Sequence, residues 1–176
     1  MTAEDPVHST DSVETSSTHQ KKHFRKALGE ITINNLGQIR AIHAAVPSHT
    51  PDVLDDTLLN DALALDPISR IVYFNDVCAG AVLCRKVPAL STDTTDKMDV
   101  EIVSLLVLPA YTGLGLASML VKNVVEEATK HPKVGRVFVS IDKTCPIKRG
   151  MYSKAGFETD SEPSDVSELL RLVKSV

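Results

Sequence analysis

The feature that most constrains this sequence is an apolar segment that runs through a glycine-containing loop directly into a helix. Residues 100–108 are almost all apolar, as expected for a central strand that is buried on both faces. Apolar residues then recur at helical spacing over residues 115–129. Between them, Gly113 and Gly115 can adopt positive φ and admit a ligand close to the backbone, and free N–H groups at a helix start attract phosphate. The segment predicts either a phosphate-binding loop or an ordinary tight turn between a strand and a helix.

Shorter patterns predict the other elements of secondary structure. Strands are expected at residues 30–34, 70–74, 77–85, 134–141 and, as a final pair, between 157 and 173. Helices are expected at residues 35–46, 52–64 and 146–155. This order of elements predicts an α/β domain of the α+β sandwich type, with a mixed central sheet flanked by helices.

The first 26 residues differ in composition from the rest of the chain. Residues 1–20 contain no Leu, Ile or aromatic residue and are rich in Ser, Thr and Asp. Because they cannot bury enough apolar surface to offset the entropy of ordering, residues 1–26 are predicted to be a disordered tail before a domain at 27–176. A basic cluster around Phe24 ends the tail and consists of Lys21, Lys22, Arg25 and Lys26. It predicts either a solvated flank or a contact for an acidic partner such as ribosomal RNA.

Bulk composition limits the class of function. Hydrophobic residues make up 43% of the chain, charged residues 24%, and the formal net charge is −4, so no general affinity for DNA is expected. No apolar run has the length of a membrane-spanning helix, and the N-terminal residues contain no apolar stretch typical of a secretory signal, so neither is expected. The three cysteines lack the paired spacing of a disulfide framework or a zinc site. We therefore expect a cytoplasmic protein without a metal centre.

Two ordered motifs resemble those of the GNAT acetyltransferases. Residues 112–117, Thr-Gly-Leu-Gly-Leu-Ala, are similar to the acetyl-CoA loop of that family, which has Arg or Gln, two residues, Gly, one residue, then Gly or Ala. Residues 151–157, Met-Tyr-Ser-Lys-Ala-Gly-Phe, resemble its aromatic-Tyr-x-Lys-x-Gly-Phe segment. The resemblance spans residues 27–173 and implies the GNAT fold, with acetyl-CoA as cosubstrate. It implies that acetyl-CoA contacts Leu106, Val107, Leu108, Thr112, Gly113, Leu114, Gly115, Leu116, Ala117, Cys145 and Tyr152.

Within that family, the chain most resembles catalytic subunits of the NatE type. Residues 73–82, Tyr-Phe-Asn-Asp-Val-Cys-Ala-Gly-Ala-Val, are similar to the central hairpin of those subunits. Val46, Pro47 and Ser48 stand where they have a proline-containing loop that binds the substrate. The resemblance implies acetylation of protein N-termini, including those of nascent peptides. It also implies association with the NatA complex, which comprises an auxiliary scaffold and a second catalytic subunit, at the ribosome.

Acetyl transfer to an amine requires three events: the amine loses a proton, the thioester oxygen is polarised, and the leaving thiolate is protonated. Backbone N–H groups near Leu106 to Leu108 are candidates to polarise the oxygen. By the resemblance, Tyr152 stands beside the sulfur of CoA as a proton donor, and the alternative is a tyrosine that only packs the helix. Glu101 and Ser140 stand where NatE-type enzymes have the Tyr and His of the base.

Glu101 is nevertheless a candidate base, because histone-type GNAT enzymes place a glutamate at the matching point of this strand. Desolvation raises the pKa of a buried carboxyl group toward a value useful to a general base. The alternative is an exposed or salt-bridged carboxylate. The other departures from the family are Thr112 and Gly113 in place of basic or amide side chains, Cys145 in place of an Asn that contacts CoA, and a tyrosine-free hairpin at 158–168.

These departures leave three hypotheses. The chain is an active acetyltransferase for protein N-termini, with Glu101 as base and Tyr152 as acid. Alternatively, it is a weak or inactive GNAT subunit that persists in the ribosome-associated N-terminal acetyltransferase complex. A third hypothesis, acetylation of a polyamine or other small amine, follows from the acidic segment 158–165, which would attract a cation.

Overall fold

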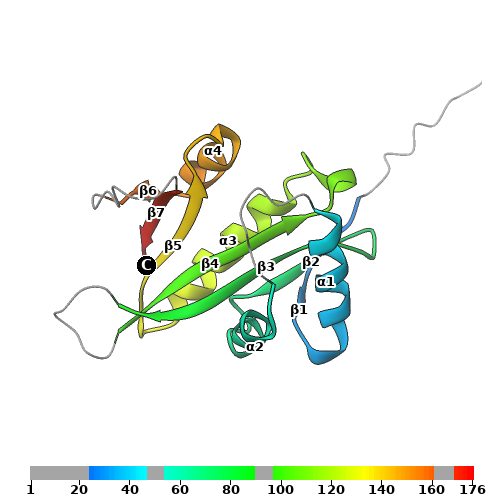
Figure 1. The fold of residues 1–176 in the computed structure, drawn as a ribbon, viewed down its shortest axis with the longest axis horizontal. Helices are drawn as coiled ribbons and strands as arrows, with labels where there is room; N and C mark the ends of the chain where they lie inside the picture. The colour runs from blue at the N-terminus through cyan, green and yellow to red at the C-terminus, as the bar shows by residue number, and fades with distance from the viewer. Residues whose placement is uncertain (1–23, 47–53, 90–96, 161–168) are drawn as a thin grey trace, which may run out of the picture.

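A computed structural model describes residues 24–46, 54–89, 97–160 and 169–176. They form one mixed sheet of seven strands in the order β1-β2-β3-β4-β5-β7-β6, with helices on both of its faces (Figure 1). The strands are β1 (Lys26–Glu30), β2 (Arg70–Phe74), β3 (Val77–Pro88), β4 (Met98–Val107), β5 (Val134–Asp142), β6 (Glu158–Thr159) and β7 (Leu169–Ser175). The helices are η1 (Ile33–Asn35), α1 (Leu36–Ala45), α2 (Asp56–Ala64), η2 (Pro109–Tyr111), α3 (Leu116–Lys130) and α4 (Pro146–Lys154). The predicted α+β sandwich is confirmed.

The direction of pairing divides the sheet at one place. Strands β1 to β4 pair antiparallel with their neighbours, and so do β5, β7 and β6. The pairing of β4 with β5 is parallel, and α3 provides the crossover connection that parallel neighbours need. This central parallel pair is the part of the sheet that positions the candidate site.

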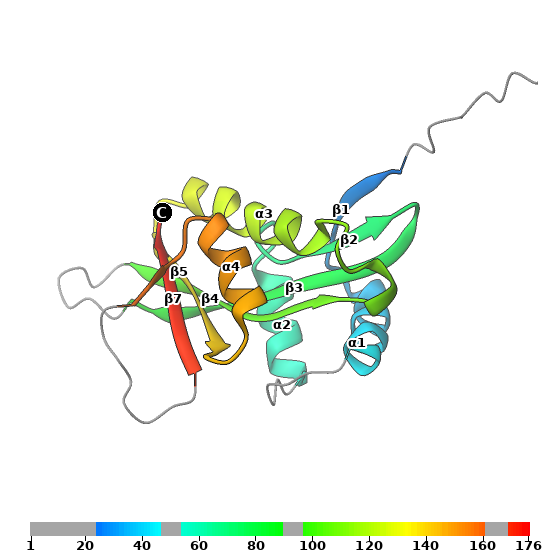
Figure 2. The ribbon, with the colours of Figure 1, turned by 90° about the horizontal axis from the view of Figure 1, so that it is seen from above.

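Two apolar cores lie on opposite faces of the sheet. The apolar stripe of α3 that the sequence predicted packs on one face, and Tyr152 of α4 joins that core. Helices α1 and α2 cover the other face through residues such as Ile39 and Leu59 (Figure 2). Because β4 has apolar residues in both cores, it is buried on both faces as its composition predicted.

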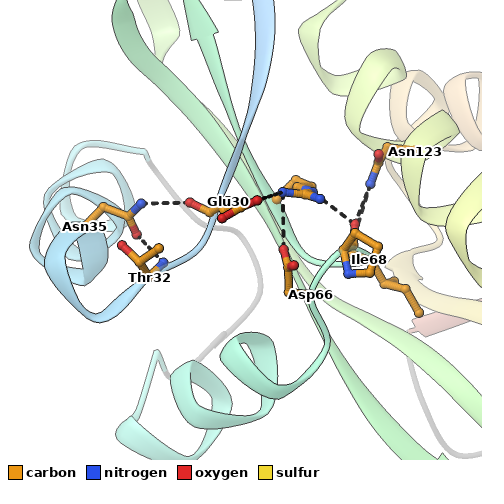
Figure 3. A network of polar contacts seen from close by, with 8 residues as sticks. Glu30, Thr32, Asn35, Asp66, Ile68 and Asn123 are labelled. Atoms are coloured by element: carbon orange, nitrogen blue, oxygen red, sulfur yellow. Dashed lines mark hydrogen bonds and ion pairs between the residues drawn. The ribbon is translucent and has the colours of Figure 1, made fainter.

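The first strand lies earlier in the chain than predicted. The expected strand at 30–34 was wrong beyond Glu30: β1 is Lys26–Glu30, and residues 33–35 form a short 3-10 helix instead. The side chain of Asn35 stabilises this turn, since it donates to the Glu30 carbonyl (2.8 Å) and accepts from the Thr32 N–H (2.9 Å; Figure 3). Helix α2 begins at Asp56, where the Asp55 carboxylate caps it by accepting from Leu58 N–H (2.8 Å).

A polar network connects the start of β2 to both sides of the sheet. The guanidinium of Arg70, which is mostly buried, lies 3.2 Å from Asp66 and 3.9 Å from Glu30. It also donates to the carbonyl of Pro67 (3.2 Å), which accepts a second bond from Asn123 of α3 (3.0 Å; Figure 3). The network therefore fixes α3 relative to β1 and β2, and thereby the position of the loop from which α3 emerges.

The predicted division into tail and domain stays a prediction, because residues 1–23 lie outside the described part of the chain. Two described residues at the end of the predicted tail contact the sheet. Phe24 stacks on Phe74 of β2 at 5.5 Å between ring centroids. Two hydrogen bonds join Arg25 to Asn75: the Asn75 side chain accepts from the Arg25 N–H (2.9 Å), and the Asn75 N–H donates to the Arg25 carbonyl (2.9 Å).

Candidate active site

The candidate site lies where β4 and β5 separate. The two strands pair from Met98 to Ile102 on β4, and the last paired residue on β5 is Val139. Both strands continue beyond this point and diverge (Figure 1). At the divergence lies a cavity of about 70 Å³, lined by residues of β4, β5 and α4 that include Val103, Leu105, Ser140 and Tyr152. The separation of the two central strands therefore leaves space for a ligand within the sheet.

A bulge in β4 accompanies the separation. Cys84 of β3 pairs with Ile102, but the next residue back, Leu83, pairs with Ser104, so that Val103 is the extra residue. A bulge bends its strand and increases the local twist, which turns the end of β4 away from β5. Bulges also re-aim side chains, and Val103 lines the cavity.

Beyond the bulge, alternate backbone donors of β4 point to the side from which β5 has departed. The N–H of Leu108 donates to the carbonyl of Ala79 in β3 (2.8 Å), and successive N–H groups of an antiparallel strand point to alternate sides. The N–H of Leu106 therefore also points to β3, whereas those of Leu105 and Val107 point to the side from which β5 has departed. Among the three amides expected to polarise a thioester, only that of Val107 points to the side of the departed β5, whereas those of Leu106 and Leu108 point to β3. The amide of Leu105 also points to the side of β5, and sequence reasoning did not name it. Only the position of the bulge could have identified Leu105.

The predicted glycine loop joins the end of β4 to α3. Gly113 and Gly115 have φ values of 75° and 77°, in the left-handed region that favours glycine. The first N–H groups of a helix have no intrahelical acceptor, and Gly115, the residue before α3, has no side chain to cap them. The hydroxyl of Thr112 donates within the loop, to the carbonyl of Pro109 (2.9 Å). The loop thus presents backbone donors rather than side chains of its own.

A lysine of the first strand brings a positive charge to this loop. The Lys26 ammonium of β1 donates to the carbonyl of Leu114 (2.5 Å). Phe74 contacts both Phe24 and Tyr111 of the loop, with a centroid distance of 5.7 Å to Tyr111, so the residues before β1 are held next to the loop. Sequence reasoning assigned Lys26 to the tail, and no local pattern could place it beside a residue 88 positions away.

Tyr152 lies on the wall of the cavity and is also packed. It is 3% exposed, and its ring meets Phe157 edge-on at 5.4 Å. The same residue lines the cavity between the diverging strands. Its ring therefore has a structural contact while the residue remains next to the space that a reacting group would occupy.

Glu101 lies on the opposite face of β4 from the α3 core, since its neighbours Val100 and Ile102 both pack in that core. Its carboxylate accepts a hydrogen bond from Arg85 of β3 (2.7 Å), and its side chain is 16% exposed. It is therefore a salt-bridged carboxylate. Its partner on β5 is Phe138, and Ser140 follows two residues later on the same face, where it lines the cavity.

The other predicted site residues are more distant from the divergence or outside the description. Cys145 is half-buried and precedes the first residue of α4, where its N–H donates to the Asp142 carbonyl (3.1 Å). Val46 follows the last residue of α1, and its N–H donates to the Ile42 carbonyl (3.0 Å). Pro47 and Ser48 lie outside the described residues.

The described residues also bear on metal binding and on membrane insertion. Within those residues, no group of three or more His, Cys, Asp or Glu side chains is placed to hold a metal ion. None of the helices in the described part has the length and apolar character required to cross a membrane.

A second hollow lies behind the cavity, between α3, α4 and β7. Its volume is about 430 Å³, and Met151 lines both it and the cavity between the strands. The two spaces are therefore neighbours along α4.

Comparison with known proteins places these features in a family. A model of the acetyltransferase (GNAT) family matches residues 37–157. The chain is 23% identical over 160 residues to N-alpha-acetyltransferase 50 of Danio rerio, covering 86% of this chain and 90% of that protein. The structure of Arabidopsis thaliana Naa50 in complex with the bisubstrate analogue CoA-Ac-MVNAL is similar, with a TM-score of 0.71 and 24% identity, covering 86% of this chain and 99% of that one. Arabidopsis thaliana NAA60 in complex with acetyl-CoA has a TM-score of 0.70 and 14% identity, covering 86% and 100%.

Proposed function

This chain belongs to the acetyltransferase (GNAT) family, and from that premise we propose that it transfers the acetyl group of acetyl-CoA to the α-amino group of protein N-termini. Two findings support this choice of donor and acceptor. The relative in Danio rerio, similar over most of both chains, is named as an N-alpha-acetyltransferase. The similar Arabidopsis protein was solved with an analogue that joins CoA to a peptide.

The observation that carries the proposal is the divergence of β4 and β5. It combines a cavity lined by Leu105, the backbone donors of Leu105 and Val107 on the side of β4 from which β5 has departed, and a loop with free N–H groups at the start of α3. The residues present fit an acyl-CoA, since a Cβ at Gly113 would meet nothing within 4 Å and the loop is thus open to a ligand. The amides of residues 113–117 would hold the diphosphate, and the cavity would admit the thioester.

The proposed chemistry combines Leu105 and Tyr152, which line the cavity, with Val107 and Glu101 of the same strand as Leu105. The neutral amine attacks the carbonyl carbon of the thioester, and the N–H groups of Leu105 and Val107 stabilise the negative charge on its oxygen. The C–N bond forms, the C–S bond breaks, and the CoA thiolate takes a proton, for which the Tyr152 hydroxyl is the proposed donor. The amine proton passes to Glu101, either directly or through water, and Arg85 holds that carboxylate in one orientation.

Binding of the donor is the first test. Acetyl-CoA at one hundred times its dissociation constant should stabilise the full-length protein by about 2.7 kcal/mol, measured by thermal unfolding and calorimetry. No stabilisation at millimolar concentration would contradict the proposed use of acetyl-CoA.

Variants of Glu101 and Tyr152 test the assigned roles, with acetylation of a panel of peptides as the assay. Glu101→Gln should lower kcat by about 10²- to 10⁴-fold, because the amide cannot accept the amine proton. Tyr152→Phe keeps the ring that packs on Phe157, so a loss of kcat at unchanged melting temperature would identify the hydroxyl as the active group. Glu127→Gln on α3, which also replaces a paired carboxylate by an amide, is the matched control. Full turnover in Glu101→Gln would remove Glu101 from the mechanism.

The salt bridge between Arg85 and Glu101 also favours a second candidate function. The guanidinium of Arg85 binds the carboxylate of Glu101, the candidate base. In addition, Ser140 stands where NatE-type enzymes have a histidine. In this case the chain serves in the cytoplasm as a weakly active or inactive subunit of the NatA complex at the ribosome. It should then co-purify with the auxiliary scaffold and the second catalytic subunit while acetylating peptides weakly or not at all. Absence of this association, tested with tagged full-length protein, would contradict the subunit function.

A further inference from the structure

The cavity between β4 and β5 has a charged side chain on its wall that the proposed mechanism does not use. Lys148 of α4 lines this cavity together with Tyr152, which follows it by one helical turn. Met151, three residues after Lys148, lines the same space. Because residues three and four apart are neighbours on one face of a helix, Lys148 belongs to the face of α4 that adjoins the diverging strands.

The wall around Lys148 is otherwise uncharged. Lys148 is the one charged side chain among the described residues that line the cavity, and the others are apolar except for the hydroxyls of Ser140 and Tyr152. In such surroundings an electrostatic interaction is stronger than in water, because fewer solvent dipoles oppose it. The lysine therefore acts most strongly on a negative charge that develops inside the cavity.

The carboxylates of the adjoining strands are bound to other groups. Glu101 of β4 accepts a hydrogen bond from Arg85 (2.7 Å), and Asp142 at the end of β5 accepts twice from Thr144 (2.6 and 2.7 Å). Within the described ranges, no carboxylate forms an ion pair with Lys148. Lys148 is also exposed, so its charge is accessible to a ligand.

The proposed transfer creates a negative charge on sulfur. When the amine adds to the thioester carbon and the C–S bond breaks, the electron pair of that bond stays on the sulfur as a thiolate. A cysteine-type thiol has a pKa of about 8.5 and a tyrosine about 10, so proton transfer from tyrosine to thiolate is unfavourable by about 1.5 pKa units. An ammonium beside the sulfur stabilises the thiolate before any proton moves.

We infer that Lys148 binds the leaving thiolate of CoA and is thus a further catalytic residue. The inference rests on the proposed function and adds to it the group that stabilises the leaving charge. As the C–N bond forms and the C–S bond breaks, the electron pair goes to the sulfur opposite the Lys148 ammonium, and the amine proton goes to Glu101. Tyr152 then supplies the proton that completes the thiol of CoA, and solvent restores the tyrosine hydroxyl.

The experiment measures the pKa of the CoA thiol while CoA is bound to the full-length protein, from the ultraviolet absorbance of the thiolate as a function of pH. Desulfo-CoA, which has no thiol, provides the blank that subtracts the protein's own cysteines and tyrosines. In the wild type, the thiol pKa should lie at least about one unit below that of free CoA, because an adjacent opposite charge favours the thiolate. This lowering should disappear in Lys148→Met and largely persist in Lys148→Arg, which keeps the charge.

Arg149→Met is the matched control for the loss of a cation. Arg149 is also an exposed basic residue of α4, but it is not among the described residues that line the cavity. It should leave the lowered thiol pKa unchanged. With the peptide panel, Lys148→Met should lower kcat by about tenfold or more at unchanged KM for the peptide, since the thiolate exists only after the bond has begun to break.

The outcomes separate the inference from the proposed function. A bound thiol with the pKa of free CoA in the wild type, or a lowered pKa that survives in Lys148→Met, would overturn the inference and leave CoA as a ligand. Failure of the wild type to bind both CoA and desulfo-CoA would overturn both. Loss of desulfo-CoA binding in Lys148→Met would assign the lysine to another part of CoA and also overturn the inference. If Lys148→Met melts at a lower temperature, Lys148→Gln, which is equally uncharged, takes its place.

Discussion

The two halves of the β4–β5 pair are built from the same two strands and differ in almost every other respect. In the paired half, Met98–Ile102 and Val134–Val139 form a parallel ladder, and the guanidinium of Arg136 donates twice to the buried carboxylate of Asp99 (2.8 and 3.2 Å). In the open half, beyond the bulge at Val103, the strands leave a cavity, and the N–H groups of Leu105 and Val107 point to the side from which β5 has departed. The comparison teaches that one bulge is enough to separate the part of a strand pair that stabilises the fold from the part that can bind a ligand.

The largest expected effect comes from forcing β3 away from β4 in the open half. In Gly80→Ala, the new Cβ would collide with the carbonyl oxygen of Leu106 and lie 3.2 Å from Cα of Val107. Because backbone cannot move as a flexible side chain does, we expect a loss of about 3 kcal/mol in the free energy of unfolding, together with loss of ligand binding. Chemical denaturation measures the first and calorimetry with acetyl-CoA the second. Gly37→Ala in α1, where a Cβ meets nothing within 4 Å, is the control, and equal stability of the two variants would contradict the prediction.

A smaller effect is expected from removing the charge in the paired half. Asp99→Asn keeps the shape of the side chain but takes away the charged acceptor of Arg136, at a position that is 1% exposed. We expect a loss of about 2 kcal/mol, less than for a fully buried pair because the Arg136 side chain is 30% exposed. In the exposed pair of Arg25 with Asp76, the variant Asp76→Asn should change stability by no more than about 0.5 kcal/mol. Similar losses in both variants would mean that burial does not set the value of the Asp99 contact.

A still smaller, pH-dependent change in the free energy of unfolding is expected at Cys84, which lies where the paired and open halves meet. Burial raises the pKa of the Cys84 thiol, which pairs with Ile102 at the bulge, to about 12, with a smaller contribution from Glu101. The unfolded chain has a thiol pKa of about 8.5, so above that pH it loses a proton that the folded chain keeps, and stability falls by about 1.4 kcal/mol per pH unit.

Denaturation at pH 8.5 and pH 9.5 checks the Cys84 prediction. The wild type should lose about 1 kcal/mol more between these values than Cys84→Ala does, whatever the cost of the substitution itself. Parallel pH profiles for the two proteins would show that Cys84 does not titrate on unfolding.

The smallest expected change in stability comes from a substitution in α4. Gly150 is inside this helix, and a Cβ there would meet nothing within 4 Å. Gly150→Ala should therefore raise the free energy of unfolding by about 0.5 to 1 kcal/mol, because alanine restricts the unfolded chain and favours helix. Acetyl-CoA binding should be unchanged, and thermal unfolding with and without the ligand measures both. A loss of affinity would indicate that flexibility of α4 is required for binding.

Elements with local signals were predicted from sequence, and those that depend on distant partners were not. Strand β2 matches its predicted range because the turn at Asn75 and Asp76, both with positive φ, marks its end. Strand β1 has the sequence Lys-Ala-Leu-Gly-Glu, which carries little strand propensity, and it is a strand because it pairs with β2, with Leu28 opposite Val72.

The residues of the candidate site also fall into those that sequence could predict and those that it could not. The glycine loop and Tyr152 are contiguous motifs, so a single stretch of sequence was sufficient to propose them. The pairing of Arg85 with Glu101 depends on a register that shifts at the bulge, and no periodicity reveals that shift. The contact of Lys26 with Leu114 and the position of Lys148 beside the diverging strands join residues from separate elements. Only the assembled sheet brings such residues together.

The placement of the aromatic residues has an optical consequence. The chain has no tryptophan and only three tyrosines, so its intrinsic emission comes from Tyr73, Tyr111 and Tyr152. Tyr111 stands in the glycine loop against Phe74, and Tyr152 forms part of the cavity wall. Two of the three natural fluorophores therefore border the proposed donor site, and the unlabelled protein carries its own spectroscopic reporter of what enters it.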